Sequence, residues 1–164
     1  MERIWNYFFY STWKFQILLG GILIEKPLIY LFNLIPFLKG KWSKGKKEYE
    51  KFMHNKDYGA NIGFAFSFMF LTTTVIYTII CLFLVNLVNI EVGDKIYYYF
   101  YTVAALSYIT NYFFLYRGDI YKKHFEEFEK SNQKSSIYLS ALGFHLGVIG
   151  LGILSIHFTV GFNL

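Results

Sequence analysis

The sequence predicts an all-α integral membrane protein, a small bundle of three to four transmembrane helices with an amphipathic N-terminal helix. Of its 164 residues, 55% are hydrophobic and only 16% are charged, whereas about 25% are charged in an ordinary soluble domain. The charges are confined to short segments, and long uncharged runs separate them. Runs of this length match the roughly 20 apolar residues that cross a bilayer as a helix.

The clearest of these runs is 136–161, which contains no Asp, Glu, Lys or Arg. Its small residues recur at helical spacing and form a ridge that includes a GxxxG pair: Ser140, Gly143, Gly147 and Gly150. In lipid, small side chains let two helix backbones approach closely, and this packing drives association. We therefore predict a transmembrane helix at the centre of the bundle, packed against another helix through this ridge.

Two further spans are expected at 61–88 and 96–116, joined by the short polar turn 89–95. Hydroxyl side chains share one face of the first span, where each can bond the carbonyl one turn back: Ser67, Thr74 and Thr78. A second ridge of small residues on the other span consists of Ala104, Ser107 and Asn111.

The first segment, 1–38, allows three arrangements. Residues 2–14 are dense in aromatic side chains, which favour the headgroup level, so an interfacial helix is expected there. Glu25, beside Lys26 and Pro27, falls at the middle of an apolar stretch, where a charge is costly. The stretch is a kinked span over 15–38, a span over about 4–24 followed by an interfacial helix over 27–38, or a re-entrant hairpin of two short helices.

Two basic segments set the expected topology. The loop 39–60 and the amphipathic helix 117–135, bent at Gly118, together carry twelve of the sixteen Lys and Arg residues. The positive-inside rule places both in the cytoplasm, and the turn and the C-terminus outside. This order of elements is common among small bacterial membrane proteins, so we expect an inner-membrane location.

The basic loop is the expected contact with anionic lipid, through Lys41, Lys44, Lys46, Lys47 and Lys51. Lysines beside a membrane surface are attracted to anionic headgroups. The net charge of +5 follows from this topology, and the sequence contains no nucleic-acid-binding motif. We therefore expect the bilayer as a partner and expect no nucleic acid.

Four polar residues within the predicted spans are candidate functional residues: Glu25, Asn111, His145 and His157. An intramembrane carboxylate or imidazole can carry protons or bind an ion. The alternative is hydrogen bonding between helices. His145 and His157 are separated by about 120° around a helix, so they do not share a face, and hydrogen bonding is favoured for them and for Asn111. For Glu25 the two alternatives stand equal.

Catalysis is not expected, because the sequence lacks the common hydrolase, metalloprotease, redox and nucleotide-binding motifs. His124 and Glu127 share a helix face, but two such ligands on a charged helix favour an ion-pair network over a metal site. We therefore expect no catalytic residue, no metal and no cofactor.

The leading hypothesis is a membrane protein that acts by helix association, as a homo-oligomer or as an accessory subunit of a membrane complex. A homo-oligomer could line a pore through the hydroxyl face of 61–88 and Asn111. One alternative is a proton- or ion-coupled transporter or membrane enzyme that uses Glu25 and the intramembrane histidines. Another is a membrane effector or immunity protein of a bacterial defence system.

Overall fold

The computed structural model describes residues 1–88, 96–131 and 134–161, and every described element is a helix. This confirms the all-α prediction, while the predicted turn at 89–95 lies outside the described residues. The elements are α1 (Glu2–Gly20), a π-helical turn (Gly21–Glu25), α2 (Lys26–Leu34), α3 (Pro36–His54), α4 (Ala60–Val88), α5 (Ile96–Asn111), a second π-helical turn (Tyr112–Tyr116), a 3-10 turn (Arg117–Asp119), α6 (Ile120–Lys130) and α7 (Lys134–Gly161).

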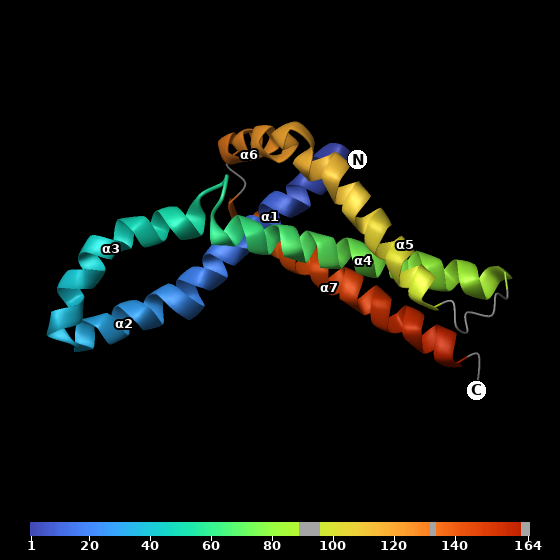
Figure 1. The fold of residues 1–164 in the computed structure, drawn as a ribbon, viewed down its shortest axis with the longest axis horizontal. Helices are drawn as coiled ribbons and strands as arrows, with labels where there is room; N and C mark the ends of the chain where they lie inside the picture. The colour runs from blue at the N-terminus through green and yellow to red at the C-terminus, as the bar shows by residue number, and fades with distance from the viewer. Residues whose placement is uncertain (89–95, 132–133, 162–164) are drawn as a thin grey trace.

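The helices form a bundle with a lateral projection. α4 and α7 run side by side in the same direction, and α5 returns along α4 (Figure 1). α6 crosses the end of the bundle where α1 begins, and α1 passes between α6 and the α4–α7 pair. α2 and α3 extend away from the bundle as a hairpin (Figure 1).

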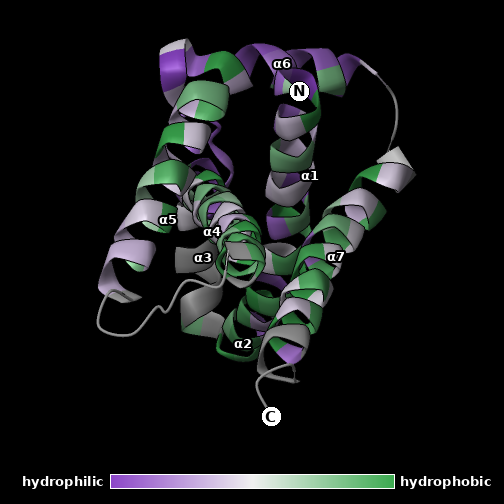
Figure 2. Ribbon diagram, turned by 90° about the vertical axis from the view of Figure 1, so that its right-hand side faces the viewer, coloured by the Kyte–Doolittle hydropathy of each residue, from purple (hydrophilic) through white to green (hydrophobic). Residues whose placement is uncertain are grey.

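Three helical stretches are long and apolar enough to cross a membrane: Glu2–Leu34, Ala60–Val85 and Ser136–His157. The predicted span 96–116 is helical but is not among them, and its seven tyrosines lower its hydropathy. Figure 2 shows hydrophobic residues along α4 and α7 and hydrophilic residues gathered on α6. Apolar and charged surfaces are therefore separated along the molecule, as a membrane requires.

The aromatic residues at the start of α1 are buried inside the protein. Phe9, Tyr10 and Trp13 are no more than 3% exposed and surround Phe125 of α6 at centroid distances of 5.0–5.2 Å. Phe125 belongs to the apolar stripe that the spacing of α6 predicts, and it is fully buried. The aromatic density of residues 2–14 therefore serves packing between α1 and α6, because the two apolar faces meet each other.

Ion pairs surround this aromatic contact. Glu129 of α6 binds Lys14 at 3.3 Å and Lys56 at 2.6 Å, and His124 contacts Glu2 at 3.1 Å. Both ends of residues 2–14 are thus joined to α6. The two ends are about 18 Å apart along α1, whereas their partners His124 and Glu129 are only about 7.5 Å apart along α6, so α1 crosses α6 (Figure 2).

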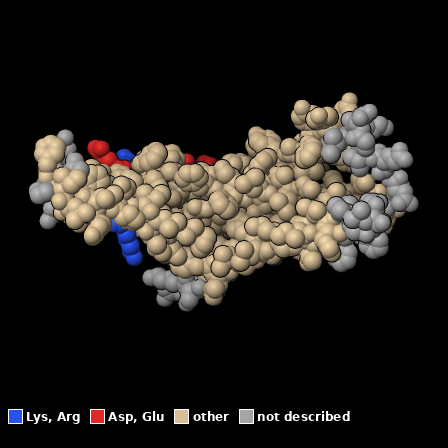
Figure 3. All heavy atoms as spheres, turned by 90° about the horizontal axis from the view of Figure 1, so that it is seen from below, with Lys and Arg blue, Asp and Glu red and all other residues tan. Residues whose placement is uncertain are grey.

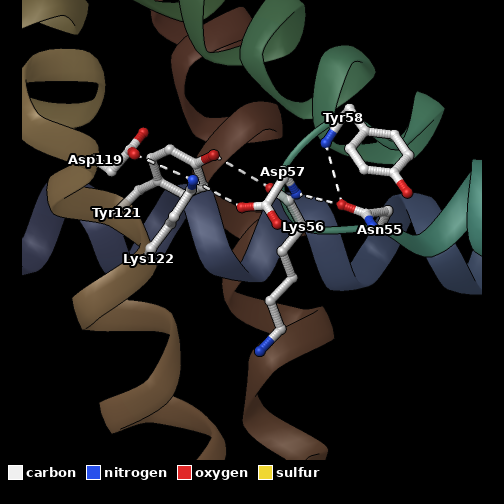
Figure 4. A network of polar contacts seen from close by, with 7 residues as sticks. All are labelled: Asn55, Lys56, Asp57, Tyr58, Asp119, Tyr121 and Lys122. Atoms are coloured by element: carbon white, nitrogen blue, oxygen red, sulfur yellow. Dashed lines mark hydrogen bonds and ion pairs between the residues drawn. The ribbon is translucent and has the colours of Figure 1, made fainter.

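The connection between α3 and α4 is joined to α6 as well (Figure 4). Lys122 bridges Asp57 at 2.7 Å and Asp119 at 3.1 Å, and the Tyr121 hydroxyl donates to the carbonyl of Lys56. The two carboxylates raise the pKa of the Lys122 ammonium. These contacts place the connection at the charged end of the bundle.

The chain turns from α5 into α6 at Gly118, where the sequence places a bend. Gly118 has φ +63° and Asp119 has φ +56°, both in the left-handed region. The preceding π-helical turn alters the carbonyl pattern of the helix, and the Asn6 amide donates to the carbonyl of Phe114 at 2.9 Å. A side chain of α1 thereby satisfies a backbone group at the bend.

Most of the segment predicted as a basic loop is helical. α3 covers Pro36–His54, with proline in its first turn, where the missing N–H costs nothing. Lysine is a good helix former, and Lys46 pairs with Glu50 one turn later at 3.5 Å. Lys46, Lys47 and Lys51 are exposed, whereas the side chains of Lys41 and Lys44 lie outside the described residues.

The glycine ridge of α7 is not filled within the chain, and packing of another helix against this ridge stays a prediction. No described atom lies within 4 Å of a Cβ built on Gly143, Gly147 or Gly150. α7 instead packs inward through other residues, and the Phe144 ring stacks on Phe8 of α1 with centroids 4.0 Å apart. The inward face of α7 therefore differs from the face that carries the glycine ridge.

The Glu129 ion pairs predict acid sensitivity. Partial burial acts to raise the pKa of Glu129, but Lys56 and Lys14 outweigh it and lower the pKa below its ordinary value of 4.5. The stabilisation is therefore complete above about pH 4.5 and is lost as the pH falls through the lower folded-state value. Thermal unfolding of the detergent-solubilised protein should show a smaller loss of Tm on acidification in Glu129→Gln than in the wild type. An equal loss in both proteins would contradict this, and Glu126→Gln on the same helix is the control.

Candidate functional site

Glu25 lies in a carboxylate–imidazole–amide contact at the base of the hairpin. Its Oε1 is 3.0 Å from Nε2 of His54, at the end of α3, and Nδ1 of His54 is 3.1 Å from the amide nitrogen of Asn61 in α4. Glu25 and His54 are partly exposed, at 26% and 29%, whereas Asn61 is buried. The contact therefore joins three helices at a place that water can reach.

The hydrogen bonds fix the proton on the His54 ring. The Asn61 amide donates to Nδ1, so the proton of the neutral ring is on Nε2, which donates to the Glu25 carboxylate. A second proton on Nδ1 would oppose the Asn61 N–H, and the amide would have to turn its oxygen to the ring. The orientation of the Asn61 amide therefore determines which ring nitrogen of His54 accepts its hydrogen bond.

Local sequence explains why Glu25 is available at this place. Pro27 lacks an N–H and disrupts helical bonding near Leu23, and the backbone N–H of Lys26 instead bonds Gly21, five residues back. Glu25 ends the resulting π-helical turn. Such turns occur frequently at functional sites.

His145 joins three helices in the interior of the bundle. Its Nε2 is 2.8 Å from the Thr12 hydroxyl of α1, and its Nδ1 is 2.8 Å from the Thr72 hydroxyl of α4. Both threonines are buried. Asn111, another of the candidate residues, is not part of this contact, because its described hydrogen bonds are to other residues.

The His145 contacts contain one proton too few for a neutral ring. Thr12 and Thr72 also lie 2.8 Å from the carbonyls of Phe8 and Phe68, one turn back in their own helices. Four hydrogen bonds require four protons, but two hydroxyls and a neutral imidazole supply three. In the neutral state one hydroxyl must therefore turn from its helix carbonyl to the ring.

Asn111 forms a separate polar contact between α5 and α4. Its amide donates to the Thr73 hydroxyl and to the carbonyl of Ser107, both at 2.9 Å, and it is 2% exposed. Trp5 of α1 donates to its oxygen at 3.4 Å. Ser107 is also buried, whereas Ala104 is exposed, so only part of the second small-residue ridge faces α4.

The other candidate residues lie apart from these contacts. His157 is at an exposed position in the outer half of α7. His124 contacts two carboxylates, Glu2 and Glu127, but among the described residues no group of three potential ligands could hold a metal ion. A hollow of about 150 Å³ between α4 and α5 is lined mainly by apolar side chains around Cys81.

Sequence reasoning missed His54, Asn61, Thr12 and Thr72 as partners. His54 falls in a basic segment, where a histidine is unremarkable, and the threonines match the pattern of self-bonded hydroxyls that α4 shows at Thr74 and Thr78. For Glu25, the sequence indicated only that a carboxylate in an apolar stretch requires a polar partner, and it did not identify that partner.

Comparisons with protein-family models, curated proteins and solved structures found no match.

The His145 contacts predict a selective effect of threonine substitutions. Thr72→Val removes a hydroxyl that reaches a second helix and should destabilise the fold by about 0.6–1.7 kcal/mol, the range of hydrogen bonds between membrane helices. Thr78→Val is the matched control, because the described bond of Thr78 is to Thr74 in its own helix. Unfolding in lipid bicelles measures both variants, and equal stability of the two would contradict a bridging role for His145.

Proposed function

We propose that this chain is an integral protein of the bacterial inner membrane that acts by helix association, as a homo-oligomer formed through the glycine face of α7. The observation that carries this proposal is the open ridge at Gly143, Gly147 and Gly150, where no described atom lies within 4 Å of an added Cβ. A ridge without side chains in a span allows close approach of another helix.

The small residues on the inward face of α7 differ from those of the ridge, because they contact other helices of the chain. A Cβ built on Gly152 would lie 3.2 Å from a methyl group of Val75 in α4, and Ala141 is fully buried. Small residues on that face already serve packing within the chain, and those of the ridge do not. The ridge of a second copy can pack against the ridge of the first, because a two-fold interface pairs the same surface on both subunits.

The contacts support an oligomer without a pore through the hydroxyl face. The Thr74 hydroxyl donates within its helix and lies 3.2 Å from Ser107, and Asn111 is buried against Thr73. Two residues of the predicted pore lining, Thr74 and Asn111, therefore make contacts between α4 and α5. The proposed oligomer buries the α7 face instead.

Bulky substitution on the ridge tests the proposal. Gly147→Leu should weaken self-association at least about tenfold, equivalent to about 1.4 kcal/mol, because the side chain separates the backbones. Gly63→Leu is the matched control, since Gly63 is an open glycine of α4 away from the ridge. Subunit number is measured by single-molecule photobleaching in bilayers. A monomeric wild type, or equal oligomers in all three proteins, would exclude this interface, and a stoichiometric co-purifying membrane protein would favour an accessory subunit.

A second candidate function is proton- or ion-coupled activity at Glu25. The specific observation in its favour is the 3.0 Å contact with His54, whose other nitrogen is held by Asn61. This pairs a carboxylate with an imidazole, a side chain that can both donate and accept a hydrogen bond. The protein partner is the histidine of α3, and neither His145 nor His157 makes a described contact with Glu25.

This second function predicts that Glu25→Gln abolishes proton or cation flux in proteoliposomes. The abundance and Tm of this variant should change no more than those of the control variant. The amide keeps the shape of the side chain but removes its charge. Glu48→Gln, an exposed acid of α3, is the control and should retain flux. Full flux in Glu25→Gln, or none in the wild type, would refute the candidate.

A further inference from the structure

The α2–α3 hairpin carries exposed apolar residues at its turn. Ile35 has an extended backbone between the two helices, and the side chains around it are largely exposed: Tyr30 67%, Leu31 55%, Leu34 60% and Ile35 49%. The hairpin projects away from the bundle, so the described bundle helices leave this surface uncovered (Figure 1). Contiguous apolar surface of this kind marks a site that contacts protein or membrane.

The two ends of the hairpin region lie at the same end of the bundle. Before it, Lys14 binds Glu129 of α6, and after it, Lys56 binds the same carboxylate. At its base, Glu25 contacts His54. A chain that leaves and returns to one place crosses the membrane twice or not at all.

Two crossings are excluded by the charge of α3. This helix contains six lysines and two glutamates in its 19 residues, and charged side chains in the hydrocarbon core are rare because they are costly. If α3 does not cross, residues 15–34 do not cross either. The length and apolar composition of Glu2–Leu34 then require another explanation.

The apolar composition of Glu2–Leu34 is explained if this helix lies in the plane of the membrane surface. Lys26, Lys47 and Lys51 are exposed on the two helices of the hairpin, between its turn and its base, and their charge complements anionic headgroups. On the face shown in Figure 3, charged side chains lie in the half of the molecule that contains α2 and α3, and the far half of α4 and α7 shows none. Apolar residues flanked by lysines are typical of helices that lie in an interface.

We propose that the α2–α3 hairpin is a lateral membrane arm, whose turn inserts into the cytoplasmic leaflet while its lysines bind anionic headgroups. The chain then crosses the membrane three times, through α4, α5 and α7, and its N-terminus lies on the side of α6. The long first helix runs along the membrane surface, and the Glu25–His54 contact fastens the arm at its base. This inference is independent of self-association through α7.

Depth measurements on the full-length protein test the arm. In a Cys81→Ala background, single cysteines at Leu34, at Leu151 in α7 and at Glu126 in α6 are labelled with an environment-sensitive fluorophore in nanodiscs of anionic and neutral lipid. All three positions are exposed, so the label does not disturb the core. Nitroxides placed near the headgroup or near the chain end report depth, and iodide reports water.

The arm predicts that the headgroup nitroxide quenches Leu34→Cys more than the deep nitroxide does, with the opposite order at Leu151→Cys. Iodide should quench position 34 several-fold less than position 126. Deep quenching at position 34 would show a crossing helix, and iodide quenching equal to that at position 126 would show a turn in water or on a protein. Either result overturns the proposal.

The lipid charge is tested in the same system. Replacing the anionic lipid by neutral lipid, or changing Lys26, Lys47 and Lys51 to Gln, should reduce lipid quenching at position 34 and increase iodide quenching. Quenching at position 151 should not change, and this would show that the protein as a whole remains inserted in the membrane. An unchanged signal at position 34 would overturn the assignment of anionic headgroups as the partner.

Discussion

The packing of α1 against α6 is the interaction on which the other features depend. Phe125 is enclosed by Phe9, Tyr10 and Trp13, and each of these rings is nearly inaccessible to solvent. Large aromatic rings contribute much of the energy of a packed interface. Because ion pairs hold both ends of this contact, the direction of α1 is set by α6. The α2–α3 hairpin that follows projects away from the bundle (Figure 1).

The same placement of α1 determines how α7 is used. Phe8 of α1 stacks on Phe144 of α7, and Thr12 of α1 forms a hydrogen bond with His145 of α7. These bulky and polar side chains face the chain, whereas Gly143, Gly147 and Gly150 face away from the other described helices. The ridge is open because another part of α7 already meets the chain.

His145 and Asn111, two polar residues inside the bundle, have hydrogen-bond partners on other helices. His145 has a hydroxyl on each nitrogen, and the Asn111 amide has acceptors on two helices. Where no water is present, the free-energy cost of leaving a polar group unpaired is larger than the net stabilisation that its hydrogen bond provides. These contacts fix the register of α1, α4, α5 and α7. The Glu25–His54–Asn61 contact differs, because the Glu25 and His54 side chains are partly exposed.

Local pattern determined much of the molecule. The sequence by itself established the helical class, the apolar stretches of α4 and α7, the bend at Gly118 and the apolar stripe of α6, because each follows from residues within one or two turns. It did not establish that Glu25 meets His54, 29 residues away, or that His145 meets Thr12, 133 residues away. Only the tertiary structure decided these pairs, the helical return of α3 and the open side of the glycine ridge. Helical spacing says which residues share a face, and packing between distant segments decides what that face contacts.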